Sequence, residues 1–290
     1  MSTATVHTIN QNTSGSAYFI AEGDDTFRPT PAAAGYWGDG VLSGPAVAGL
    51  AAWAMERSHG ASEFMPSRFT IDLLKPATAR PIRVQTRTIR DGRRMRAAEC
   101  DVIQGDSVVA TATLMQYRRS ESPAGQQWST QTTFVPPRDA EGDDVYVGSD
   151  GVGWSPMGVH HQHTGRKRAY YRGQDPVAGQ PASPFVRAVI VAEAATNLVV
   201  NLGTEGIGYI NGDLTVALSR LPCSEHIGVQ ADSQWAADGI SIGNATLFDQ
   251  DGPFGTGLVT AIANPAARID FGGAAPVDAP GSELFSRKTA

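Results

Sequence analysis

An internal repeat limits the fold of this chain more than any other feature of its sequence. Residues 69–71 (FTI) match residues 214–216 (LTV) at an offset of 145, which is half of the 290-residue length. The turn signal Asp91-Gly92 matches Asp238-Gly239 at an offset of 147. Because several matches share nearly one offset, we expect two copies of one supersecondary unit in tandem.

Each copy has the same predicted order of elements. It begins with a helix, at residues 45–57 and 187–202, that is apolar nearly all round and therefore typical of a helix buried on every side. Alternating strand patterns follow, separated by turn signals. These strands cover residues 69–73, 82–91, 94–102 and 107–117 in the first copy, and 214–218, 227–238, 240–248 and 254–263 in the second. The pattern predicts an α+β fold with two tandem antiparallel sheets, each wrapped round a buried central helix.

These elements divide the chain into two units and a connection. We expect a flexible N-terminus over 1–16, a first unit over 17–119, a linker over 120–165, a second unit over 166–271 and a flexible tail over 272–290. The linker is rich in Ser, Gly, Pro, Gln and Asp, with an extra edge strand predicted near 132–135. Residues 167–172 are predicted to form the first strand of the second unit.

Composition excludes several classes of protein. The net charge of −6 argues against nucleic acid or an anionic membrane as a partner. The two cysteines are too few for a disulfide framework or a cysteine zinc site. No membrane span or leader sequence is predicted, so we expect a cytoplasmic location. Histidines 160, 161 and 163 lie in a loop without spaced carboxylate or cysteine partners, and no metal site is predicted there.

Several longer stretches resemble the double-hotdog acyl-CoA thioesterase family, of the acyl-CoA thioesterase II type. They are FRPTPAAAGYWGDGVLSGPAVAGLAAWAMER, RFTIDLLKPATARPIRVQTRTIRDGRRM, YINGDLTVALSRLP and LFDQDGPFGTG. The resemblance covers roughly residues 17–263 and implies a double hotdog fold. It also implies an acyl-CoA substrate, hydrolysis to free acid and CoA, no metal or organic cofactor, and a homodimer or larger homo-oligomer. We expect an acyl-CoA or an acyl-carrier thioester as the bound partner.

The second copy carries the main catalytic candidates. Glu193, Thr196 and Asn197 stand at i, i+3 and i+4, and so share one face of an otherwise apolar helix. Polar groups on a buried face need partners, and a reacting water is one such partner. The alternative is that these side chains cap backbone groups or face a partner helix.

The resemblance assigns roles to positions in the same region. It places a catalytic Asp at Thr196 or Asn197, a Thr or Asn at Asn211, and a Gln at Val259, next to Thr260. Asn211 fits, whereas the Asp and Gln positions depart from the family pattern. Water would then be held by Asn211 with Thr196, Asn197 or Thr260, and Glu193 would act as the base unless it is a structural carboxylate.

Further candidates concern the substrate. Asp213 lies two residues after Asn211 and is expected on the same strand face, with a strand-edge salt bridge as the alternative. Ser43 and Gly44 precede the first helix, whose N–H groups would stabilise an oxyanion. The nearby carboxylates Asp39 and Glu56 are interpreted as capping or solvated charges.

A basic stretch distinguishes the first copy. Residues 68–96 contain nine basic and two acidic residues, a local charge of 9 − 2 = +7. Arg83 and Arg87 share a strand face and are candidates for binding the phosphates of CoA. Two alternatives remain: the basic hairpin is merely solvated, or it binds nucleic acid.

Two rival functions remain open at this point. The departures from the family pattern favour a non-hydrolytic protein that binds acyl thioesters. A hotdog hydratase or dehydratase would need an Asp and a His at the helix, and no histidine occurs between residues 164 and 225.

Overall fold

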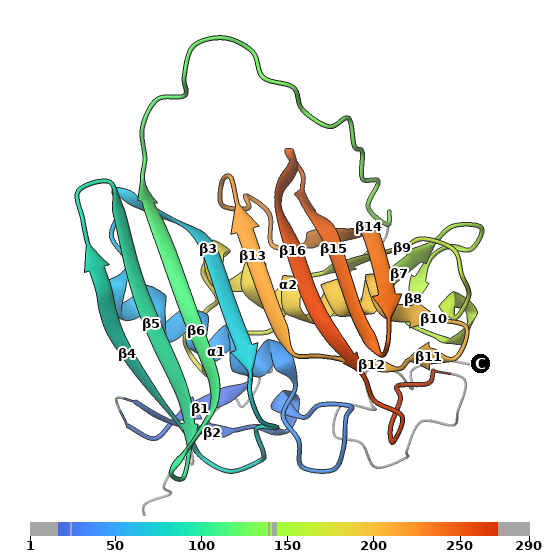
Figure 1. Cartoon of the computed structure of the whole chain (residues 1–290), viewed down its shortest axis with the longest axis horizontal. Helices are drawn as coiled ribbons and strands as arrows, with labels where there is room; N and C mark the ends of the chain where they lie inside the picture. The colour runs from blue at the N-terminus through green and yellow to red at the C-terminus, as the bar shows by residue number, and fades with distance from the viewer. Residues whose placement is uncertain (1–16, 24, 139, 141–143, 272–290) are drawn as a thin grey trace, which may run out of the picture.

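A computed structural model describes residues 17–271, apart from residues 24, 139 and 141–143, and shows one continuous antiparallel sheet behind which two helices lie (Figure 1). The fourteen strands of this sheet run in the order β1-β2-β4-β5-β6-β3-β13-β16-β15-β14-β9-β7-β8, with β12 also paired to β16. The predicted α+β class and tandem arrangement are confirmed. The two predicted sheets are joined edge to edge. The terminal segments 1–16 and 272–290, which were predicted to be flexible, lie outside the described residues.

The first half contains one long helix and six strands. The helix is α1 (Gly44–His59), preceded by the short 3-10 helix η1 (Pro31–Ala33). The strands are β1 (Phe19–Ala21), β2 (Thr26–Pro29), β3 (Phe64–Leu73), β4 (Ile82–Asp91), β5 (Met95–Gln104) and β6 (Ser107–Arg118).

The second half repeats this plan around the helix α2 (Pro184–Asn201). Its sheet strands are β9 (Lys167–Tyr171), β12 (Tyr209–Asn211), β13 (Asp213–Leu218), β14 (Ile227–Ala237), β15 (Ile240–Asp249) and β16 (Gly252–Ala263). The short strands β10 (Leu202–Gly203) and β11 (Gly206–Ile207) form a separate hairpin. Every helix and sheet strand expected of the two copies is present within a few residues of its predicted bounds.

The seam between the halves follows from the internal repeat. Strands β3 and β13 pair antiparallel, with Thr70 opposite Thr215 and their hydroxyl oxygens 3.1 Å apart. These two residues are also the equivalent positions of the repeat. When equivalent residues pair antiparallel with each other, the two copies are related by a local twofold axis at that pair. Duplication has therefore produced a pseudo-dimer within one chain.

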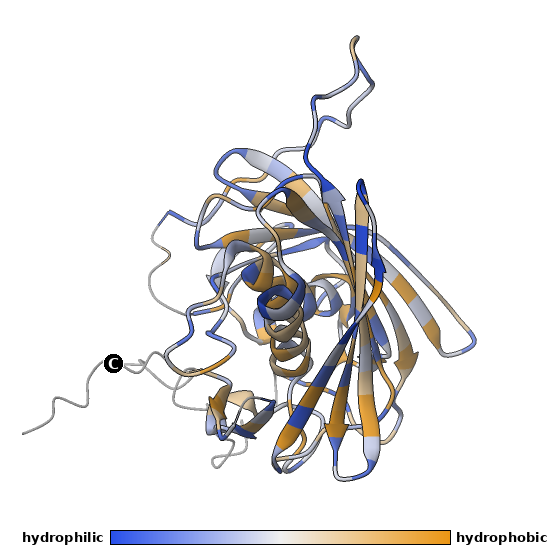
Figure 2. Ribbon diagram, turned by 90° about the vertical axis from the view of Figure 1, so that its left-hand side faces the viewer, coloured by the Kyte–Doolittle hydropathy of each residue, from blue (hydrophilic) through white to orange (hydrophobic). Residues whose placement is uncertain are grey.

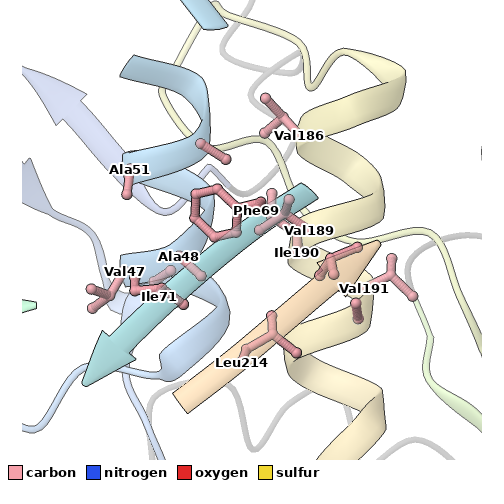
Figure 3. Close-up of a cluster of buried hydrophobic side chains, with 14 of the residues drawn as sticks. Val47, Ala48, Ala51, Phe69, Ile71, Val186, Val189, Ile190, Val191 and Leu214 are labelled. Atoms are coloured by element: carbon pink, nitrogen blue, oxygen red, sulfur yellow. The ribbon is translucent and has the colours of Figure 1, made fainter. Parts of the chain in front are cut away.

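The curved sheet wraps round both helices, so that one helix is seen nearly end-on inside it (Figure 2). Strands β3 and β13 cross over the two helices, and their side chains, including Phe69 and Leu214, pack into the space between the helices (Figure 3). Phe69 also packs edge-on against Phe185 of α2, with ring centroids 6.1 Å apart. Helix α2 is long and apolar enough to cross a membrane by composition alone. However, 83% of this helical stretch is buried, as in the core helix of a globular protein.

The two helices pack side by side and antiparallel. Gly44, Gly49 and Glu56 of α1 contact Glu193, Ile190 and Ser183, respectively, so residue numbers fall along α2 as they rise along α1. At the centre, a Cβ atom on Gly49 would lie only 2.6 Å from the Ile190 side chain. The absence of a side chain at Gly49 therefore sets how closely the helices approach.

The connection between the halves is more structured than predicted. Strands β7 (Tyr146–Ser149) and β8 (Gly153–Pro156) extend the second half of the sheet beyond β9, followed by η2 (Val159–His161). The edge strand predicted near residues 132–135 is absent, and that part of the prediction was wrong. Phe134 instead stacks on Phe248, with ring centroids 5.1 Å apart, because a large apolar side chain next to the sheet gains more from packing than from exposure.

We expect Gly49→Ala to lower the free energy of unfolding by about 1–2 kcal/mol. The overpacking against Ile190 outweighs the gain of about 1 kcal/mol in helix propensity. Chemical denaturation measures this change. Gly23→Ala is the control, since a Cβ atom there meets nothing within 4 Å. An unchanged or higher stability of Gly49→Ala would contradict the close helix approach.

Candidate active site

A large cavity opens where the two halves meet. Its volume is about 880 Å³, and it is lined by the first turn of α1, the middle of α2, strand β12 and the loops that follow β2 and β3. Most of its wall is apolar. Three lining residues carry charge, and these are Lys75, Asp144 and Glu193.

Glu193 is the central polar group of this cavity. Its side chain is buried within α2, and the residue is 4% exposed. Asn211 of β12 donates a hydrogen bond from Nδ2 to Oε1 of this carboxylate. From the other half, Gly44 faces the same carboxylate so closely that a Cβ atom there would lie 1.9 Å from Oε1. Gly44 therefore makes the space that the carboxylate occupies.

The surroundings of Glu193 change its acidity. Burial raises the pKa of the Glu193 carboxyl from its ordinary value of 4.5 to about 7, and the hydrogen bond from Asn211 opposes this rise. A carboxyl with a pKa near 7 exchanges its proton readily at neutral pH. This is the property required of a general acid-base group.

The N-terminus of α1 is open towards this carboxylate. Ser43 occupies the N-cap position but makes no side-chain cap hydrogen bond, and Pro45 follows in the first turn. Free N–H groups at a helix N-terminus carry partial positive charge and bind anions. Ser43 and Gly44, predicted as substrate-binding residues, both line the cavity.

The N-terminus of α2 differs in that it is closed. Ser183 accepts a hydrogen bond from the N–H of Val186 and donates one, 2.5 Å long, to Oε2 of Glu56 on α1. The local twofold axis thus relates two unlike arrangements. The start of α1 is open and faces Glu193 of α2, whereas the start of α2 is capped and faces Glu56 of α1. Glu56 thus binds the N-cap residue of α2, while Ser183 itself makes the cap.

Asn197 lines the cavity, but both ends of its side-chain amide are engaged. Its Nδ2 donates to the carbonyl oxygen of Tyr209 at 3.2 Å, and its Oδ1 accepts from Asn201 at 2.8 Å. Asn201 in turn accepts a hydrogen bond from Ser241. This buried chain of hydrogen bonds ties α2 to β12 and thereby positions Asn211.

Thr196 lies outside the cavity lining, contrary to its prediction as a catalytic residue. It is fully buried and faces the sheet, where its Oγ1 would lie 2.4 Å from a Cβ atom on Gly257. The i, i+3 spacing places Thr196 on the sheet-facing flank of α2, while Glu193 and Asn197 face the opening. Its Oγ1 has no hydrogen-bond partner among the described residues.

Thr260 and Asp213 lie on the outer face of the sheet. Thr260 pairs with the exposed Ile242, and its backbone N–H donates to Oδ1 of Asp213 at 3.0 Å. Asp213 therefore does not share the face of Asn211 as predicted. The reason is a β-bulge. Asn211 pairs with Ala261, and Thr215 pairs with Leu258. Four residues on the β12–β13 side therefore oppose three residues on β16, and the extra residue reverses the direction of the side chains that follow Asn211.

Arg83 and Arg87 are also on the outer face, away from the cavity. They alternate with the buried Ile82 and Val84 on β4, so their side chains point to solvent. Arg87 pairs with Glu99 of β5. Strand alternation therefore directs these two arginines away from the cavity, and their role in binding substrate phosphates stays a prediction.

The loop histidines form a hydrogen-bonded cluster with serines. His161 is fully buried, with Nδ1 2.8 Å from Ser149 Oγ and Nε2 2.8 Å from Ser155 Oγ. His160 and His163 contact the same two hydroxyls. Burial lowers the pKa of His161 to about 4, which favours the neutral imidazole.

Tyr18, Tyr171 and Gln174 are among the cavity residues that were not anticipated from the sequence. Tyr18, at the start of the first half, reaches the second half and forms a hydrogen bond with Tyr171 of β9. Gln174, in the loop after β9, lines the same cavity. No periodicity or motif distinguishes these residues, because chain segments far apart in sequence bring them together.

The arrangement of a buried carboxylate, an open helix N-terminus and an apolar cavity can next be compared with known proteins. Models of the acyl-CoA thioesterase N-terminal domain and of the acyl-CoA thioesterase C-terminal domain match residues 33–117 and 119–261, respectively. The chain belongs to the acyl-CoA thioesterase family. This membership confirms the resemblance stated above and supports thioester hydrolysis as the general activity. No curated protein sequence gave a significant match.

Solved structures show the same double-hotdog fold as this acyl-CoA thioesterase family member. A protein with a hot dog fold from Alicyclobacillus acidocaldarius is 16% identical, with a TM-score of 0.63 over 86% of this chain and 96% of that one. The acyl-CoA thioesterase II TesB2 of Mycobacterium marinum is 12% identical, with a TM-score of 0.62 over 86% and 96% of the two chains. The tesB protein of Mycobacterium avium subs paratuberculosis is 15% identical, with a TM-score of 0.57 over 85% and 96%.

We expect Thr196→Val to leave turnover of an acyl-CoA within about twofold of wild type and to maintain or raise the melting temperature. An unpartnered buried hydroxyl costs stability that an apolar group of the same shape restores. Differential scanning calorimetry and a thiol-release assay measure the two effects. Thr70→Val is the matched control, because it removes the hydrogen bond to Thr215 and should cost about 1 kcal/mol. Loss of turnover in Thr196→Val would restore Thr196 to the site.

Proposed function

We propose that this protein is an acyl-CoA thioesterase that hydrolyses acyl thioesters with water activated by Glu193. The observation that carries the proposal is the buried Glu193 carboxylate opposite the open N-terminus of α1 in an apolar cavity. Thioester hydrolysis needs a base for water and donors for the developing oxyanion. The cavity supplies both at one place.

In the proposed reaction, ionised Glu193 takes a proton from a water molecule as the water oxygen bonds to the thioester carbonyl carbon. The carbonyl oxygen becomes an oxyanion, which the free N–H groups of the first turn of α1 stabilise. The intermediate collapses when the C–S bond breaks. The thiolate then takes the proton from Glu193, giving free acid and thiol and restoring the carboxylate. These steps require no organic cofactor or metal.

Asn211 has a supporting role in this proposal. Its amide donates to Oε1 of Glu193, which orients the carboxylate and favours its ionised form. The other carboxylate oxygen is then left for water. Asn197 supports Asn211 indirectly. It donates a hydrogen bond to the backbone carbonyl of Tyr209 and so holds β12, which carries Asn211, in place.

The cavity wall supports an acyl chain as the bound group. Leu42, Val47, Leu198 and Ile207 contribute apolar surface, and transfer of an alkyl chain to such surface yields about 0.8 kcal/mol per CH₂ group. Lys75 is the one cationic residue in the lining. We therefore propose that the phosphates of CoA, or the carrier in an acyl-carrier substrate, remain outside the cavity.

The rival functions are less well supported by these contacts. A non-hydrolytic binder has no need for a buried carboxylate whose pKa is shifted to about 7. A hydratase or dehydratase of the kind considered above uses a histidine, and no histidine lines the cavity within the described part of the chain. We retain the binder as the alternative that a turnover assay decides.

We expect kcat/KM for a panel of acyl-CoA substrates to rise with pH and level off above about pH 7, as Glu193 ionises. Glu193→Gln should lose at least about 100-fold in activity and the pH dependence. CoA release with a thiol reagent measures this. Glu56→Gln is the matched control, a carboxylate at the twofold-related helix end, and should retain activity. Wild-type binding without turnover would favour the rival binder.

Stability should respond to the same group in the opposite sense. The folded state raises the pKa of Glu193, so its stabilising contribution is present below about pH 4.5 and is lost as the pH rises through about 7. Glu193→Gln should therefore raise the melting temperature at pH 8.

Asn211→Ala should raise the pH above which the enzyme becomes active, because the hydrogen bond that lowers the pKa of Glu193 is removed. A downward movement of this pH would contradict the role given to Asn211.

We also propose that the protein forms a cytoplasmic homo-oligomer. The outer face of β14–β16 exposes a group of large apolar side chains, which are Trp235, Ile240, Ile242, Leu258 and Ile262. Exposed apolar groups of this kind favour burial against another surface. Light scattering should give a mass of at least two 30.5 kDa chains. Ile240→Asp should shift the mass towards one chain, and a monomeric wild type would contradict the proposal.

A further inference from the structure

A second group of titratable side chains lies outside the active-site cavity, near the end of the connection between the two halves. His161 is fully buried and bonded at both ring nitrogens, with Nδ1 2.8 Å from Ser149 Oγ and Nε2 2.8 Å from Ser155 Oγ. His163 Nε2 lies 2.9 Å from Ser149 Oγ, and His160 Nε2 lies 2.5 Å from Ser155 Oγ. These five side chains form one hydrogen-bonded series, His160–Ser155–His161–Ser149–His163, called the imidazole chain below. The proposed hydrolysis does not use it.

One backbone group fixes the position of each hydrogen in the imidazole chain. The N–H of Gly165 donates to His163 Nδ1 at 3.0 Å, so neutral His163 carries its hydrogen on Nε2 and donates it to Ser149. Ser149 is fully buried, and its single hydrogen is donated to His161 Nδ1. His161 consequently carries its hydrogen on Nε2 and donates to Ser155. All the imidazoles are neutral in this arrangement.

An additional proton disrupts the imidazole chain. Protonated His161 would donate from both ring nitrogens, and Ser149 would then receive two donors and lose the acceptor of its own buried hydrogen. Protonated His163 would direct an N–H group at the N–H of Gly165. The closed packing of this loop is therefore compatible only with the neutral form.

The charges around the imidazole chain also disfavour a positive imidazole. Burial is the main reason that the pKa of His161 falls from 6.5 to about 4. Three neighbouring bases add to this fall, and they are His160, His163 and Lys167. Lys167 of β9 is itself buried, and its ammonium donates to two backbone carbonyls of the same loop. The carboxylates of this region are engaged by arginines, in the ion pairs Arg166–Asp232 and Arg168–Asp150.

The imidazole chain is joined to one wall of the cavity through Gln162, which lies within it in sequence. Gln162 Nε2 donates to Asp270 at 3.0 Å, and its Oε1 accepts a hydrogen bond from the N–H of Phe271 at 2.6 Å. Phe271 and Ile269 line the cavity. Their segment, residues 264–271, is called the strap below. A loop that releases Gln162 therefore also releases this part of the cavity wall.

The strap has open space against it. Besides Gln162, it is attached by two backbone hydrogen bonds between Ile269 and Ile207, at 2.8 and 3.0 Å, and by a surface ion pair of Arg268 with Glu205. It lines both the cavity and a second hollow of about 560 Å³. Segments with few buried contacts and space beside them open at low cost in free energy.

We propose that the imidazole chain is a latch that holds the strap against the cavity at neutral pH and releases it in acid. In the closed state His161 takes up a proton only near pH 4, whereas in an opened, solvated loop its pKa returns to about 6.5. The contribution of His161 to the closed state is therefore complete above pH 6.5 and is lost as the pH falls from 6.5 towards 4. Each pH unit in this range raises the ratio of open to closed protein about tenfold. The latch does not depend on the reaction that the cavity carries out.

Hydrogen–deuterium exchange of the whole protein at about pH 5 and pH 7.5, corrected for intrinsic exchange rates, tests the latch. Opening of residues 157–163 and of the strap should be about 30-fold greater at the lower pH, with β3 and β13 unchanged. His161→Gln keeps a donor and an acceptor but does not titrate, so both segments should lose the response. His226→Gln, a histidine of the same half that stacks on Tyr170 outside the imidazole chain, is the matched control and should respond as wild type.

Two further variants separate the parts of the latch. In Gln162→Leu, residues 157–163 should still open in acid, whereas the strap should be equally open at both pH values. Glu193→Gln should keep the wild-type response, and this comparison decides the proposal if His161→Gln does not fold. No acid response in wild type, a response that persists in His161→Gln or disappears in Glu193→Gln, or equal opening of β3 and β13 would each overturn the latch.

Discussion

A carboxylate buried against the positive end of a helix is the interaction on which the rest of the site depends. Removing Glu193 from water disfavours its charge, while the hydrogen bond from Asn211 and the nearby first turn of α1 favour it. The balance leaves a carboxyl whose pKa is about 7. This arrangement is possible only because Gly44 has no side chain. One glycine on the first half therefore makes room for the buried carboxylate of a glutamate on the second.

The local twofold symmetry explains why one of two similar places became a cavity. Each helix begins beside a carboxylate of the other helix, because α1 and α2 pack antiparallel across the seam at Thr70 and Thr215. At the N-terminus of α2, a serine side chain fills the gap and is hydrogen-bonded to Glu56. At the N-terminus of α1, a glycine leaves the gap open. The two helix ends thus differ mainly in side-chain size: Ser183 caps α2 and binds Glu56, whereas Gly44 leaves space for Glu193 at the uncapped start of α1.

Rigid elements hold the groups of the proposed site in place. Glu193 lies in the middle of a buried helix, and Asn211 lies on a strand paired to β16. The amides of Asn197 and Asn201 connect that helix to the backbone beside Asn211. Preorganised groups of this kind need little rearrangement when charge develops in the reaction. The apolar wall of the cavity strengthens their electrostatic effect by excluding water.

The sequence by itself determined the repeat, both helices, the main strands of each half, and Glu193 and Asn211 as site candidates, because periodicity and offset are local properties of the chain. It did not determine which way each side chain points. A bulge after Asn211 turned Asp213 outward, strand alternation placed Val259 rather than Thr260 towards α2, and helix rotation turned Thr196 to the sheet. The meeting of Gly44 and Glu193 depends on long-range packing across the two halves. Only the tertiary structure decides such contacts, since no local pattern encodes them.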